Sequence, residues 1–187
     1  MKATEVLVEE HQVIRRVITA LGTAAQALER GQLVRPGFFI EVSDFIKGFA
    51  DGSHHHKEEE VLFPALEAQG APEESNQVAG LLSEHVRGRL YCRSLREAAR
   101  KLGMGDETAR TTVIQSALAY AGLLWSHIEK EDNSLFPMAN QVLPVAQQDQ
   151  MAEEFRRLEC EESAVAIRKK YLALTEALET EANALRV

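Results

Sequence analysis

Hydrophobic residues recur every three or four positions along nearly the whole chain, which is the spacing of amphipathic α-helices. The alternation typical of β-strands is weak. A first helix is expected over residues 4–29 and should end at Gly31, because glycine readily takes the left-handed conformation that ends many helices. A second helix is expected over residues 36–68, with Pro36 in its first turn and an interruption at residues 51–53.

Two further helices follow in the second half of the bundle region. The third is expected over residues 72–102 and the fourth over residues 106–142, with Asp106 as its N-cap. Pro64 and Pro137 should kink or end the helices that contain them, because proline lacks the backbone N–H that a helix interior needs.

Four long helices joined by short connections predict an all-α fold, an up-down-up-down antiparallel four-helix bundle. An amphipathic C-terminal segment remains after the fourth helix. We therefore expect two parts, the bundle over residues 1–143 and a C-terminal helical extension over residues 144–187. The extension should pack on the bundle or at a dimer contact, so the chain is expected to be a monomer or a homodimer.

Charge and composition exclude several classes of partner. The 187 residues carry 29 acidic and 21 basic side chains, a formal net charge of −8. Such a chain repels phosphate backbones and anionic lipid, so we expect neither nucleic acid nor a membrane as its main partner. No apolar run approaches the roughly 20 residues of a membrane span, and the N-terminus lacks the apolar region of a signal peptide. Cys92 and Cys160 form no CxxC motif, and a cytoplasmic chain with free thiols is expected.

A run of three histidines and three glutamates stands out in the second helix. Residues 53–66 read SHHHKEEEVLFPAL and offer three overlapping His-x-x-x-Glu pairs. Residues 126–139 read SHIEKEDNSLFPMA and align with them without a gap. We call these two segments the internal repeat. The pairs that both segments keep are His54–Glu58 and His127–Glu131.

A helical wheel selects the same pair within the first segment. With His54 at zero, Glu58 lies at about 40° among apolar positions, and His55 at about 100° lies on their edge. His56 lies at about 200° and points away from the bundle. His55 and His56 are therefore expected to be solvated or to support the metal ligands from outside.

The first and third helices carry a weaker echo. Each places a histidine on an apolar stripe directly after a glutamate, in the dipeptides Glu10-His11 and Glu84-His85. For the two glutamates, a place on the helix surface and a role as polar gate or proton relay near the metals are both open. Tyr120 lies two turns before the histidine of the fourth helix, and either packing or a hydrogen bond toward the site would explain it. The remaining acidic residues are expected to be solvated helix charges, namely Glu59, Glu60, Glu129 and Asp132.

Ionised carboxylates inside a bundle are costly unless cations neutralise them. Because residues four apart lie one turn apart on one helical face, a His-x-x-x-Glu pair can reach one centre. We therefore expect two metal ions, each bound by two histidines and bridged by two glutamates, with an oxo, hydroxo or water bridge and one open position. Imidazole and carboxylate suit iron, and also manganese or zinc, while the lack of a thiolate argues against a closed structural zinc site. The expected ligands are His11, His54, Glu58, His85, His127 and Glu131.

These motifs resemble those of the bacterial hemerythrin-like, HHE cation-binding family, over about residues 4–142. The resemblance implies a non-haem di-iron centre in a four-helix bundle that handles oxygen, peroxide, nitric oxide or iron itself. It therefore favours iron over manganese or zinc. The invertebrate oxygen carriers have a further histidine one turn before the third-helix ligand, where Leu81 stands here. The set is more similar to that of bacterial iron–sulfur cluster repair proteins and iron-sensing eukaryotic relatives.

Three functions follow from these patterns. The chain could be a di-iron redox protein that reacts with peroxide or nitric oxide, with a redox partner. It could instead be a sensing or repair-related module without its own turnover, as in a stress response. A structural metal bundle, with zinc in place of iron, is the third. The sequence contains no obvious catalytic base or organic cofactor motif, so enzymatic activity stays an open question.

Overall fold

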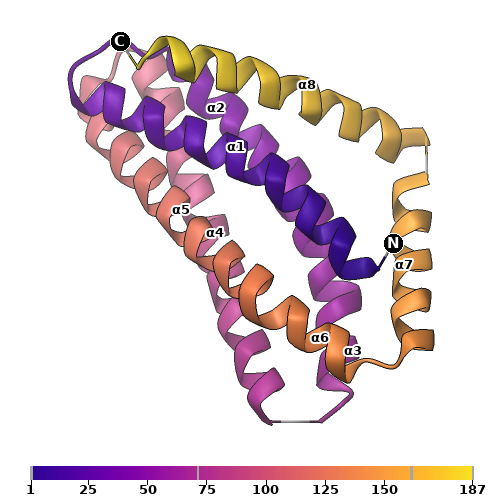
Figure 1. The fold of residues 1–187 in the computed structure, drawn as a ribbon. Coiled ribbons are helices and arrows are strands. Elements are labelled where there is room, and N and C mark those ends of the chain that lie inside the picture. The colour runs from indigo at the N-terminus through magenta and orange to yellow at the C-terminus, as the bar shows by residue number, and fades with distance from the viewer. Residues whose placement is uncertain (1, 71, 161, 187) are drawn as a thin grey trace.

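The computed structural model describes residues 2–70, 72–160 and 162–186. This part of the chain is helical and contains no β-strand, which confirms the all-α prediction. Helix α4 packs against α5 and α2, and α1 packs against α5 (Figure 1). The four helices that surround the core are α1 (Ala3–Glu29), α2 (Pro36–Phe45), α4 (Pro72–Gly103) and α5 (Arg110–Lys130).

Two local signals that end and begin helices behave as predicted. Gly31 follows α1 with a φ of 82°, the left-handed conformation expected at this turn. Asp106 caps the short 3₁₀ helix η3 (Glu107–Ala109) ahead of α5, because its carboxylate accepts the backbone N–H of Thr108 at 3.1 Å.

The expected interruption of the second helix at residues 51–53 takes the form of wider, π-helical turns. Helix α2 continues without a break into η1, and a further π-helical segment precedes each of the two prolines. The backbone N–H of Phe63 donates to the Glu58 carbonyl, five residues earlier, and that of Phe136 donates to the Glu131 carbonyl in the same way. Each proline comes directly after this last donor of the π-helical segment. The wider turn accommodates a proline that cannot continue the α-helical bonding. The segments are η1 (Ile46–His55), η2 (Glu58–Leu62), α3 (Phe63–Glu67), η4 (Glu131–Leu135) and α6 (Phe136–Val142).

The C-terminal residues form α7 (Val145–Cys160) and α8 (Glu162–Ala184), and α8 runs across α1 and α2 (Figure 1). Tyr171 and Leu178 of α8 join the core formed by the long helices. The chain approaches closely at this contact, since a β-carbon on Gly48 would overlap the Tyr171 hydroxyl. The thiol of Cys92 is free and half-buried, and the side chain of Cys160 lies outside the described residues.

The hydrophobic core is divided into two clusters, and a polar layer lies between them. On α1, Leu7 belongs to one cluster and Ile14 to the other. On α4, Leu81 and Leu95 are divided in the same way. The histidines of both helices lie between these apolar positions, so each long helix delivers its polar side chain to the middle of the bundle.

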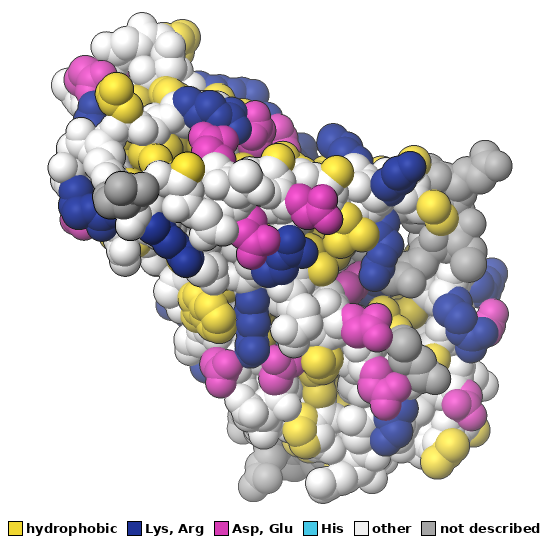
Figure 2. All heavy atoms as spheres, turned by 45° about the horizontal axis from the view of Figure 1, so that its top comes forward, with side chains coloured by type: hydrophobic (Ala, Val, Ile, Leu, Met, Phe, Trp, Pro, Cys, Tyr) yellow, Lys and Arg dark blue, Asp and Glu magenta, His cyan; other side chains and the backbone are white. Residues whose placement is uncertain are grey.

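The surface agrees with the acidic but mixed composition. Figure 2 shows one face on which basic and acidic side chains are interspersed and no histidine is visible. Among the described residues, no helix combines the length and the apolar character needed to cross a membrane.

Candidate metal centre

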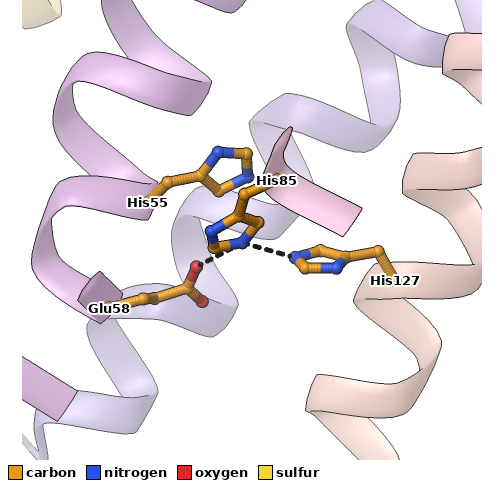
Figure 3. Close-up of side chains that lie close together, drawn as sticks. All are labelled: His55, Glu58, His85 and His127. Atoms are coloured by element: carbon orange, nitrogen blue, oxygen red, sulfur yellow. Dashed lines mark hydrogen bonds and ion pairs between the residues drawn. The ribbon is translucent and has the colours of Figure 1, made fainter. Parts of the chain in front are cut away.

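Each of the four expected histidine ligands, His11, His54, His85 and His127, lies in the polar layer and is no more than 2% exposed. The imidazoles face one another in pairs. Nε2 of His11 lies 3.0 Å from Nε2 of His54. Nε2 of His85 lies 3.0 Å from Nε2 of His127 (Figure 3). Two nitrogens that bind one metal at about 2.1 Å and at right angles would be about 3.0 Å apart. Each pair therefore has the spacing of two ligands on one ion.

Two fully buried glutamates connect the histidine pairs. The two Glu58 oxygens lie 3.4 Å from His54 Nε2 and 3.5 Å from His85 Nε2. The two Glu131 oxygens lie 3.3 Å from His11 Nε2 and 3.2 Å from His127 Nε2. Each carboxylate thus presents one oxygen to each histidine pair, which is the arrangement of a bridging ligand. We call these six residues the histidine–glutamate centre, with a first position at His11 and His54 and a second at His85 and His127.

The outer nitrogens of the four histidines determine where their lone pairs point. Each Nδ1 donates to a carboxylate on another helical segment, and a carboxylate can only accept. A neutral imidazole whose Nδ1 carries the hydrogen keeps its lone pair on Nε2, so all four lone pairs converge on the centre. The pairs are His11–Asp132 at 2.7 Å, His54–Glu10 at 3.0 Å, His85–Glu59 at 2.7 Å and His127–Glu84 at 3.0 Å.

The electrostatics of the centre call for a cation. Both oxygens of Glu58 and of Glu131 are buried, and none of the four has a hydrogen-bond donor among the described residues. Burial and the charge of Glu131 raise the pKa of Glu58 well above its usual value. Burial opposes ionisation of Glu131 as well, but the facing His127 and His11 outweigh it and lower the pKa of Glu131. Lone pairs and buried carboxylates that converge without donors match the chemistry of a metal site, in which cations take the place of the missing protons.

The supporting residues repeat between the two halves of the chain. Lys57 Nζ lies 2.5 Å from Glu10, and Lys130 pairs with Glu84. Arg15 donates to Asp132 and Arg89 donates to Glu59. Phe136 and Phe63 stack on His11 and His85 at 5.5 and 5.9 Å between ring centroids. The two halves therefore build equivalent surroundings for the two positions.

Several sequence predictions about supporting residues need correction. Glu59 and Asp132 are not solvated helix charges, since each is partly buried and holds a histidine of a neighbouring helix. The sequence held a signal for both, because an acidic residue directly follows Glu58 and Glu131 in the internal repeat. Lys57 was missed as a site residue, although it lies at about −60° on the same wheel and matches a lysine of the second segment.

The other residues that were expected near the metal ligands differ in burial and in hydrogen bonding. Glu10 is buried and Glu84 is partly buried, and both bind histidines as described above. The Tyr120 side chain is buried, but its hydroxyl makes no hydrogen bond to any described residue, toward the centre or elsewhere. His56 is exposed, while His55 is buried and stacks on His85. The wheel placed His55 only on the edge because it assumed α-helical turns, and η1 is π-helical.

Two groups of donor atoms could each hold one ion, with all atoms of a group within 4.8 Å of one another. The first group is His11, His54, Glu58 and Glu131, and the second is His55, Glu58, His85 and His127. Figure 3 shows the second group, in which His55 lies over His85 and His85 faces both Glu58 and His127. Glu58 belongs to both groups, as a bridging carboxylate would.

Comparison with known proteins agrees with this arrangement. The sequence model of the hemerythrin HHE cation binding domain matches residues 2–139. Curated relatives include the uncharacterized proteins Mb2018 of Mycobacterium bovis and Rv1995 of Mycobacterium tuberculosis, each 28% identical over 153 residues, or 82% of this chain. The chain spans 59% of the length of these relatives. No solved structure matches the chain.

Proposed function

The chain belongs to the hemerythrin HHE cation-binding domain family, and from this membership we propose that its histidine–glutamate centre holds two iron ions and binds a small oxygen- or nitrogen-containing ligand. His11 and His54 would hold one ion, His85 and His127 the other, and Glu58 and Glu131 would bridge both. An oxo or hydroxo bridge would complete the pair. We also propose the up-down-up-down order for α1, α2, α4 and α5, with α7 and α8 as an addition to this bundle.

The convergence of four Nε2 lone pairs on two donorless carboxylates is the observation that carries the proposal. When bound, iron supplies redox chemistry and a coordination position for dioxygen, peroxide or nitric oxide. The protein contributes rigidity, because each imidazole is fixed at Nδ1 by a carboxylate from another segment. Phe136 stacks on His11 and Phe63 stacks on His85, so one face of each of these two imidazoles is covered by an apolar ring.

A cavity of about 360 Å³, here called the main cavity, supports access of a ligand to the second position. It lies among η1, α4 and α5, and His55, His85 and His127 form part of its wall. Apolar side chains such as Ile46 and Leu123 and charged ones such as Arg93 line the rest of it. A small ligand could therefore reach the second position without unfolding of the bundle.

Metal content and ligand spectra test this proposal. Protein purified without added metal should contain two irons per chain, and its optical spectrum should change when nitric oxide or peroxide is added. Glu58→Ala removes a bridging carboxylate and should leave less than half of the iron. Glu60→Ala, two residues away and exposed, is the matched control and should keep all of it. Equal iron in both variants, or a spectrum that stays silent in the iron-loaded protein, would refute the proposal.

A sensing role is a second candidate, and contacts of the C-terminal helices favour it. Glu10, which holds His54, faces Lys57 at 2.5 Å and Arg168 of α8 at 3.8 Å. The Lys57 ammonium also lies 5.8 Å from the ring centroid of Phe155 in α7. A change in the metal could reach both helices through this carboxylate. Protease cleavage within residues 145–187 should then differ between metal-loaded and metal-free protein, and equal rates would argue against sensing.

A further inference from the structure

His55 breaks the equivalence of the two halves. Residues around the centre have counterparts of like chemistry in the other half, but His55 corresponds to Ile128 in the internal repeat. Both side chains are buried, at 5% and 1% exposed. Ile128 is thus the aliphatic counterpart of the imidazole that lies beside the second position.

The orientation of His55 argues against a role as a fifth histidine ligand. Its ring stacks on that of His85, with 3.9 Å between centroids and 15° between planes. An imidazole binds a metal through a lone pair that lies in the plane of its ring. Two rings stacked in parallel do not share a plane, so an ion in the plane of His85 lies off the plane of His55. One ring nitrogen of His55 nevertheless lies within 4.8 Å of the donor atoms at the second position, which is the place of a group that contacts a ligand on the ion.

The hydrogen bonding of His55 makes that Nε2 an acceptor. Nδ1 faces the Asp51 carboxylate in a long contact of 3.4 Å, and Arg89 donates to the same Asp51 oxygen at 2.8 Å. Because the carboxylate only accepts, the hydrogen of a neutral imidazole sits on Nδ1, and Nε2 keeps its lone pair. This Nε2 is buried and has no hydrogen-bond partner among the described residues. A buried acceptor without a donor costs free energy, which a ligand that carries a hydrogen would recover.

The main cavity gives such a ligand room. Its volume of about 360 Å³ exceeds by far what one diatomic molecule needs. His55 and His85 lie in its wall, together with the apolar face of Leu124. The cavity therefore fits a ligand with an organic group behind its reactive end.

We propose, building on the function proposed above, that the second position is the ligand-binding one and that His55 Nε2 accepts a hydrogen bond from the O–H of a hydroperoxide bound there. Hydrogen peroxide and alkyl hydroperoxides carry this hydrogen, whereas dioxygen and nitric oxide carry none. His55 is thus a positioning residue that selects hydroperoxides, and Ile128 offers no such contact at the first position.

The test compares two kinds of ligand on the iron-loaded protein. Stopped-flow spectroscopy of the reduced protein gives the rate constant for hydrogen peroxide and for tert-butyl hydroperoxide, and a titration gives the affinity for nitric oxide. His55→Ile copies the other half of the repeat and removes the acceptor. His55→Gln keeps an acceptor oxygen. Ile128→Val is the matched control at the first position.

His55→Ile should keep two irons per chain and the wild-type affinity for nitric oxide, while both hydroperoxides react at least about fivefold more slowly, the effect of one lost hydrogen bond. His55→Gln should restore most of the rate, and Ile128→Val should match wild type. Loss of one iron in His55→Ile would overturn the proposal, because His55 would then be a ligand. The proposal would also be overturned if His55→Ile lowered the hydroperoxide rate constants and the nitric oxide affinity by the same factor, or lowered neither. Failure of the proposed function itself would show separately, as wild-type protein without two irons.

Discussion

Replacing Glu58 by glutamine should change stability in opposite directions in the metal-free and the metal-loaded protein. In the metal-free protein both Glu58 oxygens are buried without donors, and burial together with the charge of Glu131 raises the pKa of Glu58. An amide of the same size is neutral without taking up a proton, so folding no longer carries the cost of protonating this side chain. We expect Glu58→Gln to stabilise the metal-free protein by about 1–2 kcal/mol, at the lower end of what relief of an uncompensated buried carboxylate yields.

The same substitution should weaken metal binding, because an amide oxygen lacks the charge that a bridge between two cations needs. The metal-loaded protein should therefore lose most of the stabilisation that metal gives the wild type. The assay is thermal unfolding followed by circular dichroism, after chelation and after iron loading. For a chain of 187 residues, 1 kcal/mol corresponds to a shift in Tm of about 2–4 °C.

Glu60→Gln is the control, since this exposed side chain should leave both melting temperatures unchanged. A drop of more than about 1 kcal/mol in the stability of metal-free Glu58→Gln would refute the reasoning. Such a drop would mean that the Glu58 carboxylate is a satisfied structural group rather than a metal ligand held in an unfavourable place.

Three other predictions address the supporting structure. Burial opposes protonation of His127, but Glu131 and Glu84 outweigh it and raise the pKa of His127 from 6.5 to about 9. The protonated imidazole therefore stabilises the metal-free protein fully below pH 6.5, and denaturant titrations should show a loss of about 3 kcal/mol in the free energy of unfolding as the pH rises to 9. A free energy of unfolding that does not change over this pH range would contradict the prediction. Lys57→Met removes the ammonium partner of the buried Glu10 carboxylate and should lower the free energy of chemical unfolding by about 3 kcal/mol. Lys130→Met, at the more exposed pair with Glu84, should lower it by less than about 1 kcal/mol. Equal losses in the two variants would refute the difference in burial between the two pairs. Gly48→Ala should loosen α8 and speed its proteolysis, because the new β-carbon overlaps the Tyr171 hydroxyl. Adding Tyr171→Phe to this variant should partly restore the slower cleavage. An unchanged cleavage rate in Gly48→Ala would show that α8 does not pack against Gly48.

The fold and the six residues of the centre were open to prediction because they obey simple periodicity. The internal repeat selected His54 and Glu58 from three overlapping pairs, and the structure brings both together with His127 and Glu131. The apolar positions on both sides of His11 placed it inside the bundle by the same reasoning.

The residues that surround the centre were harder to predict, because their positions depend on departures from that periodicity and on contacts between helices. The π-helical turns of η1 bring His55 inward, and a wheel of about 100° per residue does not include them. Glu59 and Asp132 bind histidines of neighbouring helices, so neither their own helical face nor their polarity reveals the contact. Lys57 was on the apolar side of the wheel, but a lysine there is unremarkable until the buried carboxylate of Glu10 is known.

We propose that the histidine–glutamate centre holds two ions bridged by Glu58 and Glu131. The most direct measurement is an anaerobic titration of metal-free protein with iron(II), followed by calorimetry and by elemental analysis after removal of free metal. We expect two equivalents of iron per chain in the wild type and fewer than one in a Glu58→Ala, Glu131→Ala double variant. Saturation at one equivalent in the wild type, or two equivalents retained by the double variant, would contradict it.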